Sequence, residues 1–224
     1  MSGGVAPIPL PTQNPPLNLR RGLLSFQNLN AAALALILSA SGMVGVQDIA
    51  FVLLSLFYIF FLSKFAFPTL STTPPPPIFS DHQRLLTLYV SIGALIGLLL
   101  PVAYILHGAI EGDKNGIKSA APHAFLMASQ VLVEAVTFSG GFSLPVRVFV
   151  PVVYNAMRMY AILDWVKVEM MRGDEGGSGR RLVVGRSIAV ANMVFWGFNL
   201  FGFLLPVYMP KAFKKYYTDN DKDS

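Results

Sequence analysis

The sequence predicts an all-α, multi-pass integral membrane protein, formed as a bundle of about six helices of which four to six span the bilayer. Hydrophobic residues make up 54% of the 224 residues and charged residues only 13%, against about 25% charged residues in soluble domains. Several apolar segments also approach the roughly 20 residues that a helix needs to cross the hydrocarbon core. Together these observations exclude an ordinary soluble domain.

The chain divides into an arm, one helical domain and a tail. Residues 1–22 are rich in proline and are predicted to be a disordered arm. Residues 23–217 form the helical membrane domain, and residues 218–224 alternate acidic, amide and basic side chains, which predicts a disordered tail. The candidate helices cover residues 29–46, 49–67, 85–106, 122–139, 144–168 and 187–209.

Small residues recur at helical spacing in two of these segments. Ala31, Ala35 and Ser39 lie four residues apart, and Gly93 and Gly97 repeat the spacing in a later helix. Small side chains on one face let a second helix approach closely. We therefore expect these five residues to be helix-packing positions, within the chain or in a homo- or hetero-oligomer.

The segment from residue 122 to residue 168 is the most informative part of the chain. Pro122 suits the first turn of a helix, and His123, Gln130, Glu134 and Thr137 then follow at spacings of seven, four and three. This spacing places one polar stripe on an otherwise apolar helix.

A second helix is expected to begin near Leu144, after the glycine pair Gly140 and Gly141. It places Arg147, Asn155 and Arg158 among apolar residues, which completes a hairpin of two amphipathic helices. The candidate polar residues inside the membrane are therefore Gln130, Glu134, Arg147, Asn155 and Arg158.

An ionisable group in hydrocarbon is costly, so it usually finds a partner or lines a polar path. Glu134 could pair with Arg147 or with Arg158, either along a route for a solute, ion or proton or as a purely structural contact. The number of spans depends on the same segment. If the helix from Leu144 lies on the membrane surface there are five spans, which the distribution of Lys and Arg favours, and if it crosses there are six.

The residue types present point away from catalysis. Cysteine is absent, which excludes thiolate nucleophiles and thiolate metal sites, and no nucleophile with a matching base is evident. His107, Glu111 and His123 have a spacing that we interpret as chance and not as a metal site. We expect a protein that is not an enzyme and holds no metal or cofactor.

The basic residues occur in short clusters between apolar runs, without the interleaved aromatic residues of a nucleic-acid surface. The residues from Lys167 to Arg186 are predicted to form a flexible, glycine-rich loop. Lys211, Lys214 and Lys215 follow the last apolar segment and are expected to bind anionic lipid headgroups and not nucleic acid.

The stretch SQVLVEAVTFSGGFSLPVRVFVPVVYNAMRMYAILDW, residues 129–165, resembles a plant-specific family of small integral membrane proteins that is catalogued only as a domain of unknown function. The resemblance covers about the last two-thirds of the chain. It implies a plant origin and a multi-pass membrane protein, and it supplies no activity, ligand or catalytic residue.

Two functions remain open from the sequence. The first is a non-catalytic membrane protein that acts through helix packing or partner binding. The alternative is a small transporter or channel subunit with a polar path along residues 122–168. The expected location is an endomembrane or the plasma membrane, with the plastid envelope as the alternative.

Overall fold

The computed structural model describes residues 26–69, 83–139, 141–173 and 179–223, and the predicted arm of residues 1–22 lies outside them. Six continuous helices make up the described part, and three of them contain π-helical turns, labelled η, within the helix or at its end. They are α2 (Phe26–Ala40); α3 (Val46–Phe61) with η1 (Leu62–Ala66); α4 (Gln83–Ala94), η3 (Leu95–Leu99) and α5 (Leu100–Glu111); α6 (Lys114–Ser139); α7 (Leu144–Met171); and α8 (Gly179–Phe198), η4 (Asn199–Tyr208) and α9 (Met209–Asp223).

Five of these helices are long and apolar enough to cross a membrane, which confirms the all-α, multi-pass prediction. The number equals that of the five-span arrangement weighed from the sequence, but a different set of helices makes it up. The helix from Leu144 meets the requirement, whereas α2 is too short. The five candidate spans are Val46–Ala66, Arg84–Glu111, Lys114–Ser139, Leu144–Met171 and Gly179–Thr218.

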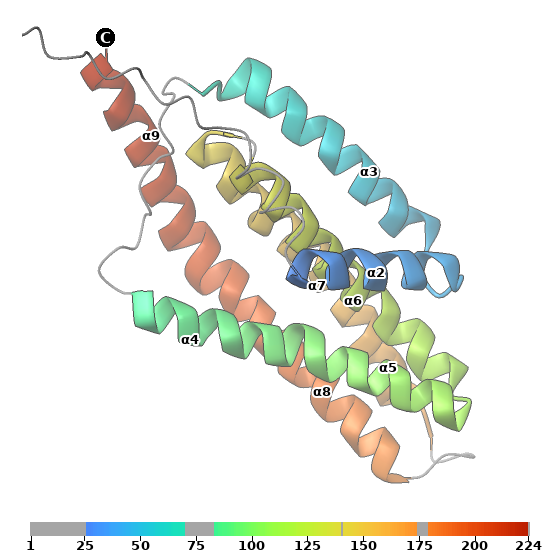
Figure 1. Ribbon diagram of the computed structural model, residues 1–224. Helices are drawn as coiled ribbons and strands as arrows, with labels where there is room; N and C mark the ends of the chain where they lie inside the picture. Colours follow the sequence, from blue (N-terminus) through green and yellow to red (C-terminus); the bar gives the residue numbers. More distant parts are fainter. Residues whose placement is uncertain (1–25, 70–82, 140, 174–178, 224) are drawn as a thin grey trace, which may run out of the picture.

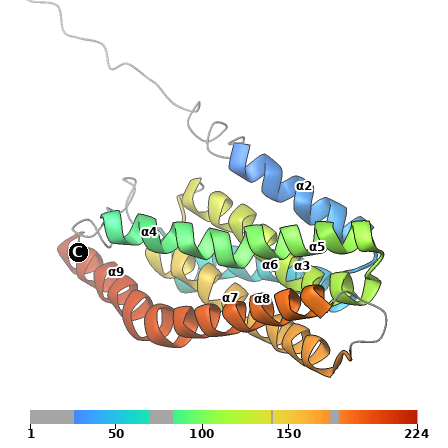
Figure 2. The ribbon, with the colours of Figure 1, turned by 90° about the horizontal axis from the view of Figure 1, so that it is seen from below.

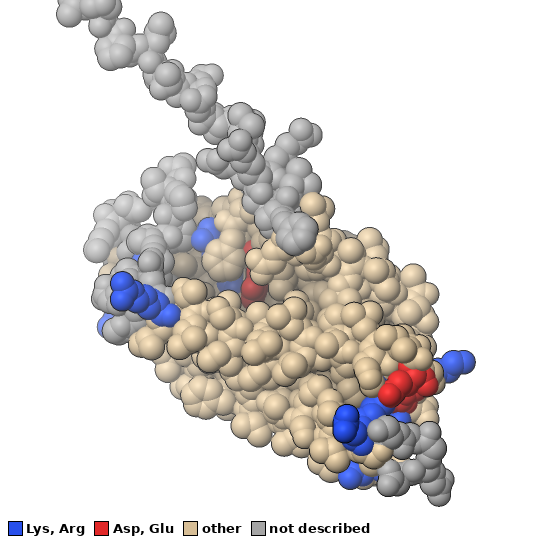
Figure 3. Space-filling view, turned by 60° about the horizontal axis from the view of Figure 1, so that its bottom comes forward, with Lys and Arg blue, Asp and Glu red and all other residues tan. Residues whose placement is uncertain are grey.

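The long helices lie roughly along one direction, and α2 lies at an angle to them (Figures 1 and 2). Helices α6 and α7 are the most buried of the candidate spans, whereas α3 and the α4–α5 helix are largely exposed. On the face that Figure 3 shows, most charged side chains gather at two ends, and the surface between them is largely uncharged apart from a few charged atoms in a hollow. A bilayer would cover this uncharged belt, since its hydrocarbon core solvates apolar side chains and not ionised ones.

Small residues of α2 pack inside the chain. Ala31 and Ala35 are buried in a cluster with Ala121 and Ala124 of α6, and the hydroxyl of Ser39 donates to the carbonyl of Ala35 at 2.7 Å. This face of α2 is therefore covered by α6.

Gly93 and Gly97 face α8. A Cβ added to Gly93 would lie 3.3 Å from the ring of Phe195, and one added to Gly97 would lie 2.4 Å from the indole of Trp196. The close approach of these two helices therefore depends on the missing side chain at Gly97.

Helix α6 begins at Lys114 and carries Pro122 inside it, whereas the sequence analysis placed Pro122 in its first turn. The helix begins earlier because Asp113, nine residues before Pro122, caps its first turn. The Asp113 carboxylate accepts a hydrogen bond from the Gly116 amide at 2.9 Å, which satisfies one of the amides left without a partner at a helix start.

Other helix ends also differ from the sequence analysis. Helix α2 ends at Ala40, before a turn in which Gly42 has a φ of 69°. Arg180, Arg181 and Arg186 belong to α8 and not to a loop, and α9 continues to Asp223 through the residues predicted as a tail. A helix that extends beyond the apolar belt carries charged side chains at its end. In the sequence such a polar segment resembles a loop.

Replacing Gly97 by alanine is expected to lower the free energy of unfolding by about 1 to 3 kcal/mol, the usual cost of overpacking a filled contact. The Trp196 indole is buried and cannot move away freely. Thermal unfolding in detergent, followed by near-ultraviolet circular dichroism, would measure a midpoint several degrees lower. Gly173→Ala is the control, because nothing lies within 4 Å of its added Cβ; equal midpoints for the two variants would contradict the contact.

Candidate functional site

Polar side chains meet inside the bundle, where α6, α7 and α8 are in contact. His123 of α6, Asn155 and Arg158 of α7 and Asn192 of α8 each have no exposed surface. We call this group, together with Gln130 and Glu134, the polar core. It lies within the candidate spans, where water is absent and every polar group must be satisfied by the protein or by a bound molecule.

Arg158 is the most unusual member of the polar core. Its guanidinium lies over the ring of Trp196, 3.9 Å from the centroid, and Nη1 donates to the sulfur of Met127. The Nε and Nη2 atoms are buried without a hydrogen-bond partner. A cation–π contact stabilises the charge, but it leaves two donors unused.

The neighbours of Arg158 are also only partly satisfied. Nε2 of His123 bonds to the carbonyl of Gly97 at 2.9 Å, and the amide of Asn155 donates to the carbonyl of Trp196 at 3.2 Å. Nδ1 of His123 and Oδ1 of Asn155 remain buried without a partner. The polar core therefore offers unused donors and acceptors side by side.

Glu134 accepts a hydrogen bond of 2.6 Å from the amide of Gln130, and it interacts electrostatically with Arg158. Among the described residues, neither Arg158 nor Arg147 forms a direct ion pair with it. Arg147 instead donates to the carbonyl of Phe142 at 2.8 Å and covers the ring of Phe138. Four of the five predicted polar residues thus meet inside the bundle, while Arg147 lies apart at the start of α7.

A second polar group lies at one end of the bundle, where the turn from α5 to α6 meets the end of α7 and the start of α8. We call it the charged cluster. Asp113 lies at its centre, 2.8 Å from Nη2 of Arg172 and 2.8 Å from Nε of Arg181. The hydroxyl of Tyr104 donates to Glu169 at 2.6 Å. These bonds join four helices at the edge of the belt.

Glu169 is fully buried and depends on the charged cluster for its compensation. One of its oxygens accepts from Tyr104 and lies 3.4 Å from Nη1 of Arg172, and its backbone carbonyl accepts from Arg186 at 2.9 Å. A Cβ added to Gly185 would lie 2.7 Å from its other oxygen. The glycine thus allows α8 to approach this carboxylate.

The charges of the cluster shift one another's protonation. Burial opposes ionisation of Asp113, yet the hydrogen bonds from Gly116, Arg181 and Arg172 outweigh it and hold the pKa of the carboxyl below its ordinary value. Burial likewise disfavours the Arg172 cation, and Asp113 more than offsets this, so the pKa of that guanidinium is raised. Both groups are therefore charged at neutral pH.

Sequence reasoning missed the charged cluster, because it assigned Arg172 and Arg181 to a flexible loop. The one available signal was Asp113, three residues before Gly116 at the start of a helix. His107 and Glu111, considered and rejected as metal ligands, instead contact Arg181, while His123 is buried in the polar core. The described residues hold no group of three side chains that could bind a metal.

Replacing Asp113 by asparagine is expected to destabilise the fold at neutral pH by about 1.5 to 3 kcal/mol, the range for hydrogen bonds to a charged group. Because the pKa of Asp113 is lowered on folding, its contribution is complete above the ordinary value of 3.8 and is lost as the pH falls below it.

Unfolding midpoints of the Asp113→Asn protein and the unchanged protein between pH 2 and pH 7 would therefore converge on the acid side. Asp164→Asn is the control, since Asp164 is 75% exposed and its ion pair with Lys167 contributes little. A constant difference across the whole range would contradict the assignment.

We compared the chain with protein families, with curated proteins and with solved structures. The model of the family described as Domain of unknown function (DUF7733) matches residues 24–217, which include both polar groups. The search of curated proteins and the search of solved structures found no match. Since the family model covers well over half of the chain, the protein belongs to the DUF7733 family.

Proposed function

We propose that the chain is a non-catalytic integral membrane protein that binds a small polar solute in the polar core and passes it through the α6–α7–α8 contact. The observation that carries this proposal is Arg158, which is fully buried inside a candidate span with two donors unused. Leaving a buried charged group incompletely paired costs several kcal/mol. A bound solute with an acceptor group would remove that cost.

A purely structural role accounts less well for the polar core. Helix packing between apolar faces needs no buried cation, and replacing buried ion pairs with apolar residues often stabilises a protein. The small-residue faces that could bind a partner are already occupied within the chain, by α6 for Ala31 and Ala35 and by α8 for Gly97. The transport function therefore has the stronger support of the two.

The unused atoms define the chemistry of the solute. Nε and Nη2 of Arg158 can donate to a carboxylate, a phosphate or a carbonyl in a bidentate contact. Oδ1 of Asn155 accepts, and Nδ1 of His123 can accept or donate according to its tautomer. The solute we propose is small, bears an acceptor for Arg158 and carries at least one hydroxyl or amine.

The lysine group on α9 has a separate proposed role. Lys211, Lys214 and Lys215 lie on α9, in the last turns of the long Gly179–Thr218 helix, at the end of the bundle opposite the charged cluster (Figure 1). Lysines near the membrane surface are attracted to anionic headgroups by about 1 kcal/mol each. We propose that they orient this end against an anionic membrane surface.

The two tryptophans of the chain provide a direct test of solute binding. Trp196 stacks on Arg158, and Trp165 stacks on His123 with ring centroids 6.1 Å apart. Protein in lipid nanodiscs would be titrated with succinate, glycine, inorganic phosphate and glycerol while tryptophan fluorescence is recorded. A saturable change is expected for at least one solute that has an acceptor.

Replacing Arg158 by methionine is expected to weaken that binding by about tenfold to a hundredfold, since a charge-assisted contact contributes about 1.5 to 3 kcal/mol. Arg84→Met is the matched control, because Arg84 is exposed at the start of α4. Proteoliposomes loaded with the radiolabelled solute would then measure its movement. A titration that is unchanged by Arg158→Met, or uptake equal to that of empty liposomes, would refute the proposal.

A further inference from the structure

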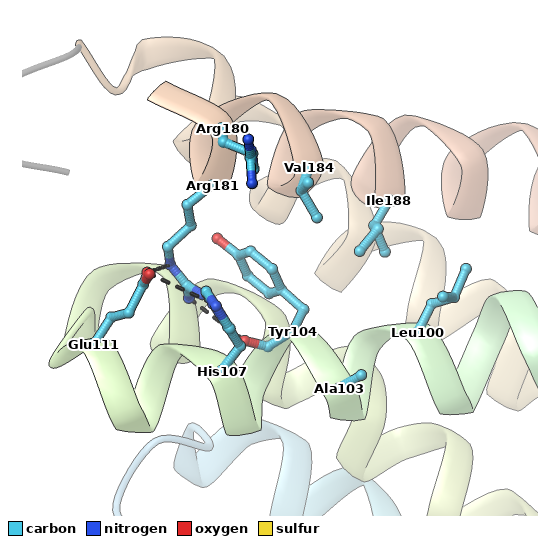
Figure 4. A pocket seen from close by; sticks show the side chains of 9 residues that line it. All are labelled: Leu100, Ala103, Tyr104, His107, Glu111, Arg180, Arg181, Val184 and Ile188. Atoms are coloured by element: carbon cyan, nitrogen blue, oxygen red, sulfur yellow. Dashed lines mark hydrogen bonds and ion pairs between the residues drawn. The ribbon is translucent and has the colours of Figure 1, made fainter. Parts of the chain in front are cut away.

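A pocket of about 480 Å³ opens between α5 and α8, apart from the polar core (Figure 4). Its inner walls are apolar: Leu100 and Ala103 face it from α5, and Val184 and Ile188 face it from α8. The volume is in the range of pockets that bind small organic ligands. These walls alone would accept any apolar group of suitable size.

The mouth of the pocket is charged. Arg180 is exposed there, and within the described residues it makes no hydrogen bond or ion pair. Arg181 is held by Asp113 at 2.8 Å and donates to Nδ1 of His107 at 2.8 Å. Because arginine only donates, Nδ1 of His107 is the acceptor, and the imidazole keeps its proton on Nε2 as a further donor.

The balance of charge at this mouth favours an anion. Glu111 lies 3.4 Å from Nε of Arg181, and Asp113 is shared by Arg172 and Arg181. These two carboxylates therefore compensate the arginines that touch them. Arg180 remains as the positive charge at the mouth without a described partner, on a side chain able to bind an oxyanion through two parallel hydrogen bonds.

The pocket runs from an apolar end to a charged end, as the edge of a membrane does. Leu100 at the apolar end and Glu111 at the charged end are eleven positions apart, which is about 16 Å along a helix. Exposed apolar side chains are next in sequence to residues that line the pocket, including Leu99 at 59%, Leu106 at 61% and Val183 at 62%. An apolar chain in the belt can thus continue directly into the pocket.

We propose that this pocket binds one anionic phospholipid whose headgroup is a phosphate monoester, with part of an acyl chain between α5 and α8. The phosphate accepts from Arg180 and from Nε2 of His107, and Leu100, Val184 and Ile188 contact the chain. A phosphate monoester carries close to two negative charges at neutral pH. A zwitterionic headgroup would instead place its positively charged ammonium group near the guanidinium of Arg180, which would repel it. The site is independent of the solute bound by the polar core.

Native mass spectrometry of the full chain, released from vesicles of phosphatidylcholine with one part in ten phosphatidic acid, would test the proposal. One phosphatidic acid per chain is expected to survive release. Arg180→Gln is expected to reduce its occupancy at least fivefold, and Val184→Trp, which fills the pocket, is expected to abolish it. Arg84→Gln is the matched control, since Arg84 is an exposed arginine of another helix, and it is expected to retain the lipid.

Three results would overturn the proposal. The first is equal retention of phosphatidylcholine and phosphatidic acid. The second is phosphatidic acid binding that both Arg180→Gln and Val184→Trp leave unchanged while their unfolding midpoints match the unchanged protein. The third is release of the lipid by millimolar inorganic phosphate, because the site would then recognise a free anion without its chain.

Discussion

Arg158 has no exposed surface and lies where α6, α7 and α8 meet, so its charge must be compensated from inside the bundle. The arrangement of these three helices follows from that requirement. The ring of Trp196 in α8 and the sulfur of Met127 in α6 both contact the guanidinium. Gly97, which lies between α4 and α5, leaves room for the indole of Trp196. The compensation is incomplete, because Nε and Nη2 of Arg158 have no hydrogen-bond partner among the described residues.

In the charged cluster, by contrast, ion pairs between neighbouring side chains compensate the charges. Asp113, Arg172 and Arg181 are fully engaged with one another, and the cap on α6 uses the same carboxylate. Because the cluster lies at the edge of the belt, Asp113 and Arg172 keep some contact with water while they join neighbouring helices. Ion pairs therefore hold the helices together at this end, where one oxygen of Glu169 stays without a hydrogen bond, while most of the unsatisfied polar atoms lie in the polar core.

The sequence alone predicted the helical membrane class, because apolar runs of spanning length need no tertiary information. It also identified Gln130, Glu134, Asn155 and Arg158 as inner polar residues, since their helical spacing puts them on one side of α6 and α7. It did not predict that Arg158 would contact Trp196 in place of Glu134. That choice depends on how α8 packs against α7, which no local pattern encodes. The charged cluster was missed for a related reason, because its members come from helices distant in sequence.

The length of the last candidate span has a consequence for how the protein contacts its lipids. The last span, Gly179–Thr218, begins at the charged cluster and ends beside the α9 lysines. If this helix crosses the bilayer, the pocket at Arg180 and the group of Lys211, Lys214 and Lys215 face opposite leaflets. A lipid enriched in one leaflet could occupy only one of them, so the two regions would respond separately to the two halves of an asymmetric bilayer.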